Sequence, residues 1–170
     1  MRSRIIGHVL PFPRLAPPWP SRVEALEPAA ALVLTACIRP WVAAARQKQD
    51  PLPPVIAALE ESWAPRAAGL SAHALMHGIA LQATRIVEVG CPTCPGLTAD
   101  EMLLLHAVAE ASLGADRPAR GLAEFVHDAA LVFLDPPLTG LARRLDAEGW
   151  HFRPRRAPGA APHDATPWLH

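Results

Sequence analysis

Two cysteines separated by two residues, Cys91 and Cys94, are the side chains of this chain best suited to chemistry. They lie in the segment Cys91-Pro92-Thr93-Cys94-Pro95, directly before the helix-start pattern Thr98-Ala99-Asp100-Glu101. A Cys-x-x-Cys pair can bind a metal ion, cycle between dithiol and disulfide, or supply small apolar residues to a rigid corner. The spacing alone leaves all three interpretations open.

A zinc or iron site would need further ligands, because two thiolates do not complete a coordination shell. The candidates are His106, Glu110, Glu124 and His127. Glu124 and His127 form a Glu-x-x-His, the ligand pair of ferritin-like di-iron sites. His106 and Glu110 lie about as far before the predicted turn at 114–118 as that pair lies after it, so the four could share one level of a helical hairpin.

Three other potential ligands fit less well. His73 and His77 share a helical face, but a helix running from Ser71 to Val89 would place the nearer of them, His77, about 21 Å from Cys91 at 1.5 Å per residue. Cys37 lies in an apolar run and is predicted to be a small buried residue. With three cysteines in the chain, an all-cysteine metal site within one subunit is excluded.

The redox interpretation rests on position, because a helix N-terminus lowers the pKa of a nearby thiol. His106 is the first candidate for a histidine that meets the thiols. The four residues Cys-Pro-Thr-Cys resemble a glutaredoxin-type site, but that fold places a strand just before the motif, and here the following chain is predicted to be helical. The all-helical alkylhydroperoxidase/carboxymuconolactone decarboxylase-like family also uses Cys-x-x-Cys. Its peroxidase members carry a histidine four residues later, where this chain has Thr98.

Composition bounds the class of protein. A chain of 170 residues and 18.2 kDa fits one domain, and 51% hydrophobic with 19% charged residues excludes wholesale disorder. A net charge of zero indicates no nucleic-acid partner. The longest apolar run, 29–38, is too short to span a membrane, so no membrane association and a cytoplasmic location are predicted. The alanine-rich sequence, with Lys48 as its one lysine, is typical of a GC-rich bacterial genome.

Apolar periodicity predicts an all-α fold, a bundle of five to six helices with proline-rich extended N- and C-terminal arms. The arms are residues 1–20 and 151–170, the second partly disordered, and the single helical domain is 21–150. Its helices are expected at 29–46 with a bend at Pro40, 51–63, 71–89, 98–114, 116–135 and 138–149. Leu75, Ile79 and Ile86 are expected to face inward, and the arms' aromatic residues to pack on the body or on a second subunit.

The functional prediction follows from the apolar helices and from the lack of a convergent catalytic set in the sequence. We expect protein–protein association, as a homodimer or with another protein, without a cofactor and without enzymatic activity. The alternative is a metal-binding (zinc or iron) or thiol-redox protein centred on Cys91 and Cys94, with thiol–disulfide or peroxide-type activity if it is an enzyme. That alternative predicts a pocket in which the thiols meet His106.

Overall fold

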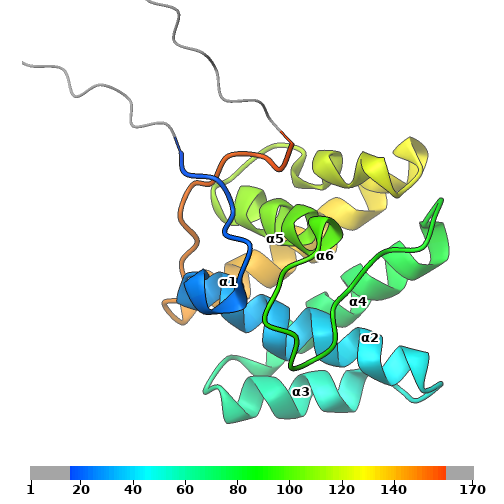
Figure 1. Cartoon of the computed structure of the whole chain (residues 1–170), viewed down its shortest axis with the longest axis vertical. Helices are drawn as coiled ribbons and strands as arrows, with labels where there is room; N and C mark the ends of the chain where they lie inside the picture. Colours follow the sequence, from blue (N-terminus) through cyan, green and yellow to red (C-terminus); the bar gives the residue numbers. More distant parts are fainter. Residues whose placement is uncertain (1–15, 160–170) are drawn as a thin grey trace, which may run out of the picture.

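The structure is a computed structural model that describes residues 16–159. Within that range the regular elements are all helical, which confirms the predicted all-α fold (Figure 1). The described part of the chain holds six α-helices: α1 (Pro28–Leu32), α2 (Arg39–Arg46), α3 (Leu52–Glu61), α4 (Arg66–Gln82), α5 (Ala99–Ser112) and α6 (Asp128–Ala147). Three further segments are η1 (Val23–Ala25) and η3 (Pro118–Glu124), both 3-10 helices, and η2 (Val33–Ile38), a π-helix. The outer parts of the predicted arms, 1–15 and 160–170, lie outside the described residues.

The segments α1, η2 and α2 form one continuous helix from Pro28 to Arg46. Pro28 lies in its first turn, where the missing N–H would have no partner in any case. We expected a bend at Pro40, but the helix continues through this residue, and the irregularity lies in the π-helical turn directly before it. A π turn of this kind holds one more residue than an α-helical turn.

This long helix forms the centre of the core. Its length and mean hydropathy of 1.5 would suffice to cross a membrane, but 61% of that window is buried inside the protein. Arg39, near the middle of the apolar run, is buried and ion-paired with Glu101. Both properties are those of a core helix in contact with other helices.

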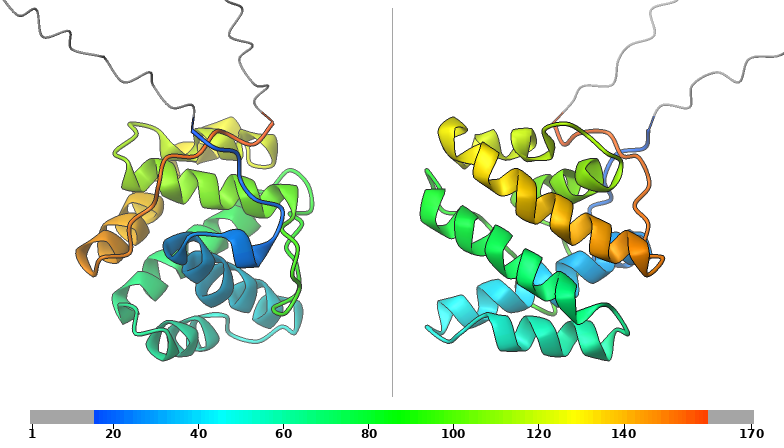
Figure 2. Two further views of the ribbon diagram at one scale, coloured as in Figure 1. Left: turned by 60° about the vertical axis from the view of Figure 1, so that its left-hand side comes forward. Right: turned by 180° about the vertical axis from the view of Figure 1, so that it is seen from behind.

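The long helix packs on α3, α4 and α5. α4 packs on both α3 and α6, and α6 in turn packs on α5 and η3. From behind, α4 and α6 are seen side by side, with α6 extending toward the turn at residue 149 (Figure 2). Five leucines of α5 and α6 are at most 1% exposed: Leu104, Leu105, Leu138, Leu141 and Leu145.

α4 differs from its predicted bounds at both ends, since it begins at Arg66 and ends at Gln82. Leu75 and Ile79 are buried as expected, but Ile86 is 87% exposed and lies outside the helix. α4 ends here because the backbone at residues 82–84 forms hydrogen bonds with the backbone at residues 125–127 instead of continuing the helix. The Thr84 N–H donates to the Phe125 carbonyl (2.9 Å), and the His127 N–H to the Gln82 carbonyl (3.4 Å). The chain from 83 to 98 is therefore an extended loop, neither the predicted helix nor a strand.

α6 runs through Pro136 and Pro137, where we expected one helix to close and another to begin. Each proline leaves the carbonyl four residues before it without a helical hydrogen bond. Those carbonyls belong to Val132 and Phe133, which are exposed, so water can reach them. On the opposite side Leu134, Leu138 and Leu141 are buried and hold both halves of the helix against the core.

The inner parts of the two ends lie against the body and against each other. Trp19 and Phe152 are buried, as predicted for arm aromatics. The Arg156 N–H donates to the Pro17 carbonyl (3.0 Å), and the Arg153 N–H to Glu27 Oε1 (3.1 Å). Residues 16–20 and 151–156 thus cover one side of the core.

Candidate functional site

The Cys91–Cys94 segment lies in the loop between α4 and α5, which passes in front of α2 in Figure 1. Cys91 and Cys94 form a disulfide with a Cα–Cα distance of 5.1 Å. Cys91 is an exposed residue and Cys94 is half-buried. The Cys91 Sγ lies 3.7 Å from the Thr93 hydroxyl, its hydrogen-bond partner.

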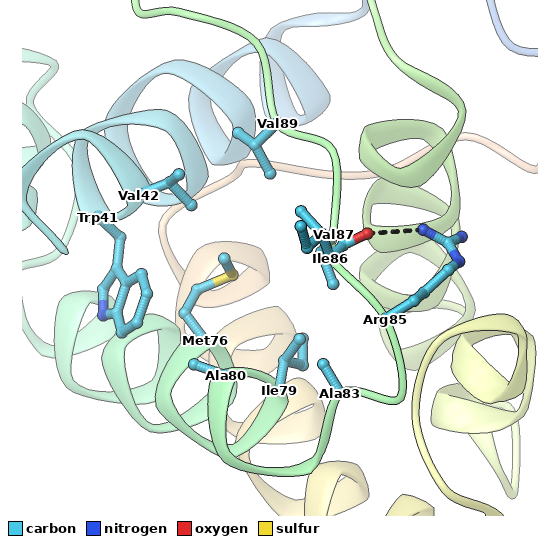
Figure 3. Close-up of a pocket in the computed structure, with 10 residues that line it drawn as sticks. All are labelled: Trp41, Val42, Met76, Ile79, Ala80, Ala83, Arg85, Ile86, Val87 and Val89. Carbon is cyan, nitrogen blue, oxygen red and sulfur yellow. Dashed lines mark hydrogen bonds between the residues drawn. The ribbon is translucent and has the colours of Figure 1, made fainter. Parts of the chain in front are cut away.

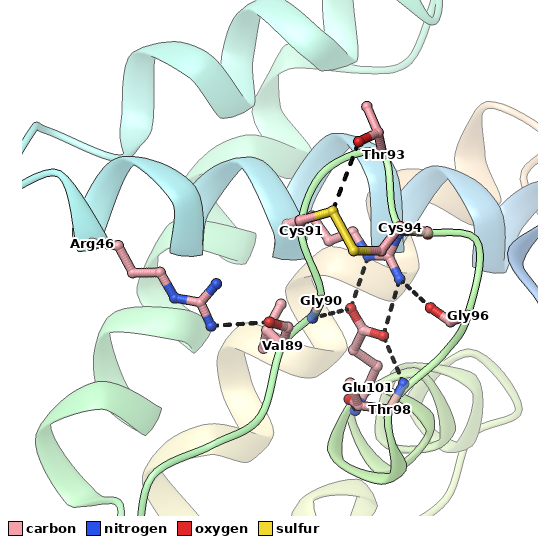
Figure 4. The surroundings of a disulfide bond; sticks show 10 residues. Arg46, Val89, Gly90, Cys91, Thr93, Cys94, Gly96, Thr98 and Glu101 are labelled. Atoms are coloured by element: carbon pink, nitrogen blue, oxygen red, sulfur yellow. Dashed lines mark hydrogen bonds and ion pairs between the residues drawn. A yellow bond between two sulfur atoms is a disulfide. The ribbon is translucent and has the colours of Figure 1, made fainter.

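A buried arginine holds this loop from below. Arg39 is 1% exposed, and its Nη1 donates to the Cys94 carbonyl (2.5 Å) while its Nη2 donates to the Gly96 carbonyl (2.7 Å). Its Nε and Nη2 also donate to the two carboxylate oxygens of Glu101, at 2.8 and 3.1 Å. A buried guanidinium is tolerable only when its charge and its donors are matched in this way. The backbone of Cys94 and Gly96 is therefore fixed to the core (Figure 4).

The Glu101 carboxylate joins the loop to the start of α5. Thr98 and Glu101 form a capping box, in which the Thr98 hydroxyl accepts from the Glu101 N–H (3.0 Å) and Glu101 Oε2 accepts from the Thr98 N–H (2.9 Å). Glu101 Oε1 accepts in addition from the Gly90 N–H at 3.0 Å. A Cβ at Gly90 would lie 3.1 Å from Arg39 Nη2, so a larger residue would crowd the ion pair.

The first half of the loop is held by a second set of contacts. Asp100 accepts two hydrogen bonds from Arg85, each 2.7 Å, and one from the Glu88 N–H at 2.7 Å. The Arg85 guanidinium lowers the pKa of Asp100, although partial burial opposes the shift. Arg46 donates to the Val89 carbonyl (2.9 Å) and the Thr98 hydroxyl to the Glu88 carbonyl (2.6 Å). The loop is thus fixed on both sides of the disulfide by residues other than the cysteines.

His106, the histidine expected beside the thiols, lies elsewhere. Its ring contacts Trp19 edge to face at 6.4 Å between centroids, and its Nε2 is 4.0 Å from Glu110. Burial lowers the pKa of His106, and the nearby Glu110 opposes this shift only in part. The predicted thiol–histidine pocket is therefore not formed, because the face of α5 that carries His106 is turned toward residue 19.

The remaining predicted metal ligands do not converge. The chain leaves the helical conformation between the end of η3 at Glu124 and the start of α6, so Glu124 and His127 do not share a helical face. Both are exposed, whereas His106 is largely covered. Within residues 16–159, no three histidine, cysteine, aspartate or glutamate side chains are placed to hold a metal ion.

The other singled-out residues are placed largely as expected. His73 and His77 share one face of α4, their rings stacked at 5.9 Å, and Trp41 Nε1 donates to His73 Nδ1 (3.2 Å). Cys37 is buried, and burial raises the pKa of its thiol to about 12. That pKa makes Cys37 unreactive near neutral pH.

The chain matches no protein-family model, no curated protein and no solved structure. The site must therefore be interpreted from its own geometry. Sequence reasoning found the cysteines and the helix start at Thr98–Glu101, but it missed Arg39 and the ion pair through which Arg39 and Glu101 hold the loop. One signal was available: Arg39 is the single charged residue of the apolar segment 28–45, and a charge in such a segment calls for a buried partner.

Proposed function

We propose that Cys91 and Cys94 form a reversible disulfide that exchanges with cysteines of a partner protein. The observation that carries this proposal is an accessible disulfide on a loop whose conformation does not depend on it. Arg39, Arg46 and the capping-box residues hold the loop through other contacts. The disulfide itself joins residues only three positions apart, and a ring that small contributes at most about 2 kcal/mol of chain-entropy stabilisation.

The exchange proceeds in two steps. A thiolate of the partner attacks the Sγ of Cys91, the more exposed of the two residues; the S–S bond breaks, and Cys94 leaves as a thiolate that takes up a proton. A second thiolate of the partner then attacks the partner's first cysteine sulfur in the mixed disulfide. A disulfide forms within the partner, and Cys91 is released as a thiolate. Two electrons pass from the partner dithiol to the protein, and the reverse sequence oxidises the protein again. The Thr93 hydroxyl is placed to donate to Cys91 when it is a thiolate.

The competing metal interpretation of the same cysteines has less support. A metal ion would require both thiolates to be free and further ligands nearby, and no such group of side chains exists among residues 16–159. In a reducing cytoplasm, the predicted location, a disulfide of this kind is expected to be transient.

The test is a redox titration followed by thiol labelling. The protein is equilibrated in dithiothreitol buffers of graded potential, quenched in acid, alkylated and weighed by mass spectrometry. We expect two alkyl groups to be gained in one two-electron step, with Cys37 labelled only after unfolding. Circular dichroism should show the same helix content in both states.

Matched variants locate the reactive pair. Cys91→Ser should abolish the transition and Cys37→Ser should leave it unchanged. Loss of helix content on reduction would contradict the proposal and assign the disulfide a structural role, as would a pair that stays oxidised at the potential of dithiothreitol.

A second candidate function, association of two copies of the chain, is favoured by an exposed stripe on α4. Leu70, Ala74, His77 and Leu81 follow one another at spacings of four, three and four residues, and all are exposed. Leu70 and Leu81 are 60% and 67% exposed. This spacing is that of a coiled-coil seam, which pairs with a second helix. The stripe supports the homodimer expected from the sequence.

Light scattering tests this association. The protein should have the mass of two chains at micromolar concentration, and Leu81→Asp should reduce it to one, because a carboxylate in the seam would be desolvated. Leu113→Asp, at an exposed apolar residue outside the stripe, is the control and should remain dimeric. A single-chain mass for the unmodified protein at every accessible concentration rejects the dimer.

A further inference from the structure

An apolar groove begins beside the disulfide loop. It lies between α2, the second half of α4 and the extended segment 85–89, and has a volume of about 240 Å³. The buried residues of its lining are Ile79, Met76, Val89 and Trp41, and Val89 is the one nearest to the cysteines in the sequence (Figure 3). Ile86 is 87% exposed at its edge.

The size and chemistry of the groove limit what it can hold. Pockets for cofactors and drug-sized molecules have volumes of about 300–1,000 Å³, so this groove suits one or two amino-acid side chains instead. Arg85 is the one charged residue of the lining, and its guanidinium donates two hydrogen bonds of 2.7 Å to the Asp100 carboxylate. The lining therefore favours an apolar group and offers no free charge to a polar one.

Its position links the groove to the disulfide. Val89 and Cys91 are two residues apart, which is at most about 7 Å along an extended chain. A partner cysteine joined to Cys91 in a mixed disulfide would place its neighbouring residues over Val89. Val42 and Val87 line the walls there, and the loop is fixed at this point by Arg46 and Glu101.

We propose that this groove binds an apolar side chain next to the reactive cysteine of the partner, so that the protein selects cysteine peptides with apolar neighbours. This inference rests on the proposed exchange function and adds its substrate class. The occupant is a segment of the partner because Val89, which lines the groove, lies two residues from the cysteine that the partner must reach.

The test uses the Cys94→Ser variant, in which Cys91 is the sole reactive thiol because Cys37 is buried with a pKa of about 12. Its thiol is mixed with two peptides of equal length, each carrying a thionitrobenzoate-activated cysteine flanked by leucine in one and by aspartate in the other. The release of thionitrobenzoate gives each rate. Each variant's rates are divided by its own rate with the small disulfide dithiobis(nitrobenzoate). We expect the leucine peptide to react about tenfold faster, since one aliphatic side chain leaves water.

Two further variants, made in the same background, separate the groove from general effects. Ile86 lies at the exposed edge of the groove, so Ile86→Asp should leave the fold intact. It should bring the two peptide rates within about twofold of each other. Trp63→Asp changes a residue that is 94% exposed and does not line the groove. It should keep the preference.

Each outcome has a distinct meaning. Equal rates for the two peptides, with normal reaction of the small disulfide, would overturn the groove inference and leave the exchange function standing. A Cys91 thiol that fails to react even with the small disulfide would overturn both. Light scattering that shows Ile86→Asp dissociating a dimer would assign the groove to a second copy of the chain and overturn the inference.

Discussion

At the scale of single residues, the ion pair between Arg39 and Glu101 unites three tasks. It neutralises a charge inside the apolar helix from Pro28 to Arg46, it caps α5, and it holds the backbone of Cys94 and Gly96. Both side chains are at most 1% exposed. Removal of one partner would leave the other as a buried charge with no counterion, and this is far more costly than the pair itself.

Arg39→Met should therefore lower the free energy of unfolding by about 3–5 kcal/mol, measured by urea denaturation. The double variant Arg39→Met with Glu101→Leu should recover part of that loss, because no uncompensated charge remains. Arg66→Met is the matched control, since Arg66 and Glu60 form an exposed pair at 3.5 Å; it should cost less than about 1 kcal/mol. Equal losses for Arg39→Met and Arg66→Met would contradict the assigned role.

His106 makes a second prediction at this scale, on pH. Burial lowers its pKa in the folded protein, whereas in the unfolded chain it takes up a proton near its ordinary pKa of about 6.5. Its contribution to stability is thus fully present above that pH and is lost as the pH falls toward the lower folded pKa. Denaturation at pH 7.5 and 5.5 should show a decrease that is smaller in His106→Leu. If His106→Leu lost as much stability as the unmodified protein between these two pH values, titratable groups other than His106 would be responsible for the loss.

At the scale of elements, local signals were sufficient where they acted within one helix. The Thr98–Glu101 capping box marks the start of α5 from sequence alone, and the structure forms both of its hydrogen bonds. Leu75 and Ile79 likewise mark the buried face of α4.

Elements whose bounds depend on other parts of the chain were predicted less well. The end of α4 at Gln82 depends on backbone contacts with Phe125 and His127, more than 40 residues away. The continuation of α6 through Pro136 depends on which of its sides faces solvent. For the candidate site, the cysteine pair could be found from spacing, but its support by Arg39 joins residues 55 positions apart. Apolar periodicity carries no information of that range.

At the scale of the whole molecule, the inner ends of both termini close one side of the core. Trp19 is 8% exposed and contacts His106 and Arg155, whose guanidinium lies 5.8 Å from the Trp19 ring centroid. The helical domain therefore extends beyond the predicted range 21–150 in its packing, since residues on both sides of that range are buried against it.

Trp19→Ala should lower the free energy of unfolding by about 3–5 kcal/mol, as for other buried aromatic residues. Trp63→Ala is the matched control, because Trp63 is 94% exposed and its truncation should change stability by less than about 0.5 kcal/mol. Thermal or urea denaturation compares the two. A Trp19→Ala variant as stable as Trp63→Ala would show that the segment before Ser21 contributes little to the fold.

The π-helical turn η2 sets the angular phase of the long helix. Each residue of an α-helix turns the chain by about 100°. Because η2 takes up one extra residue, the side chains after Ile38 point about 100° away from where an uninterrupted α-helix would direct them. Ala29, Ala30 and Val33 and then Arg39 and Trp41 are buried on either side of this offset. A regular α-helix over the same residues would rotate Arg39 by about 100° away from Glu101, whereas a deletion of one residue within Val33–Ile38 would remove the extra residue and keep Arg39 directed at Glu101. The π-helical form of this turn thus determines the direction of the Arg39 guanidinium, and therefore whether it can hold the backbone of the disulfide loop.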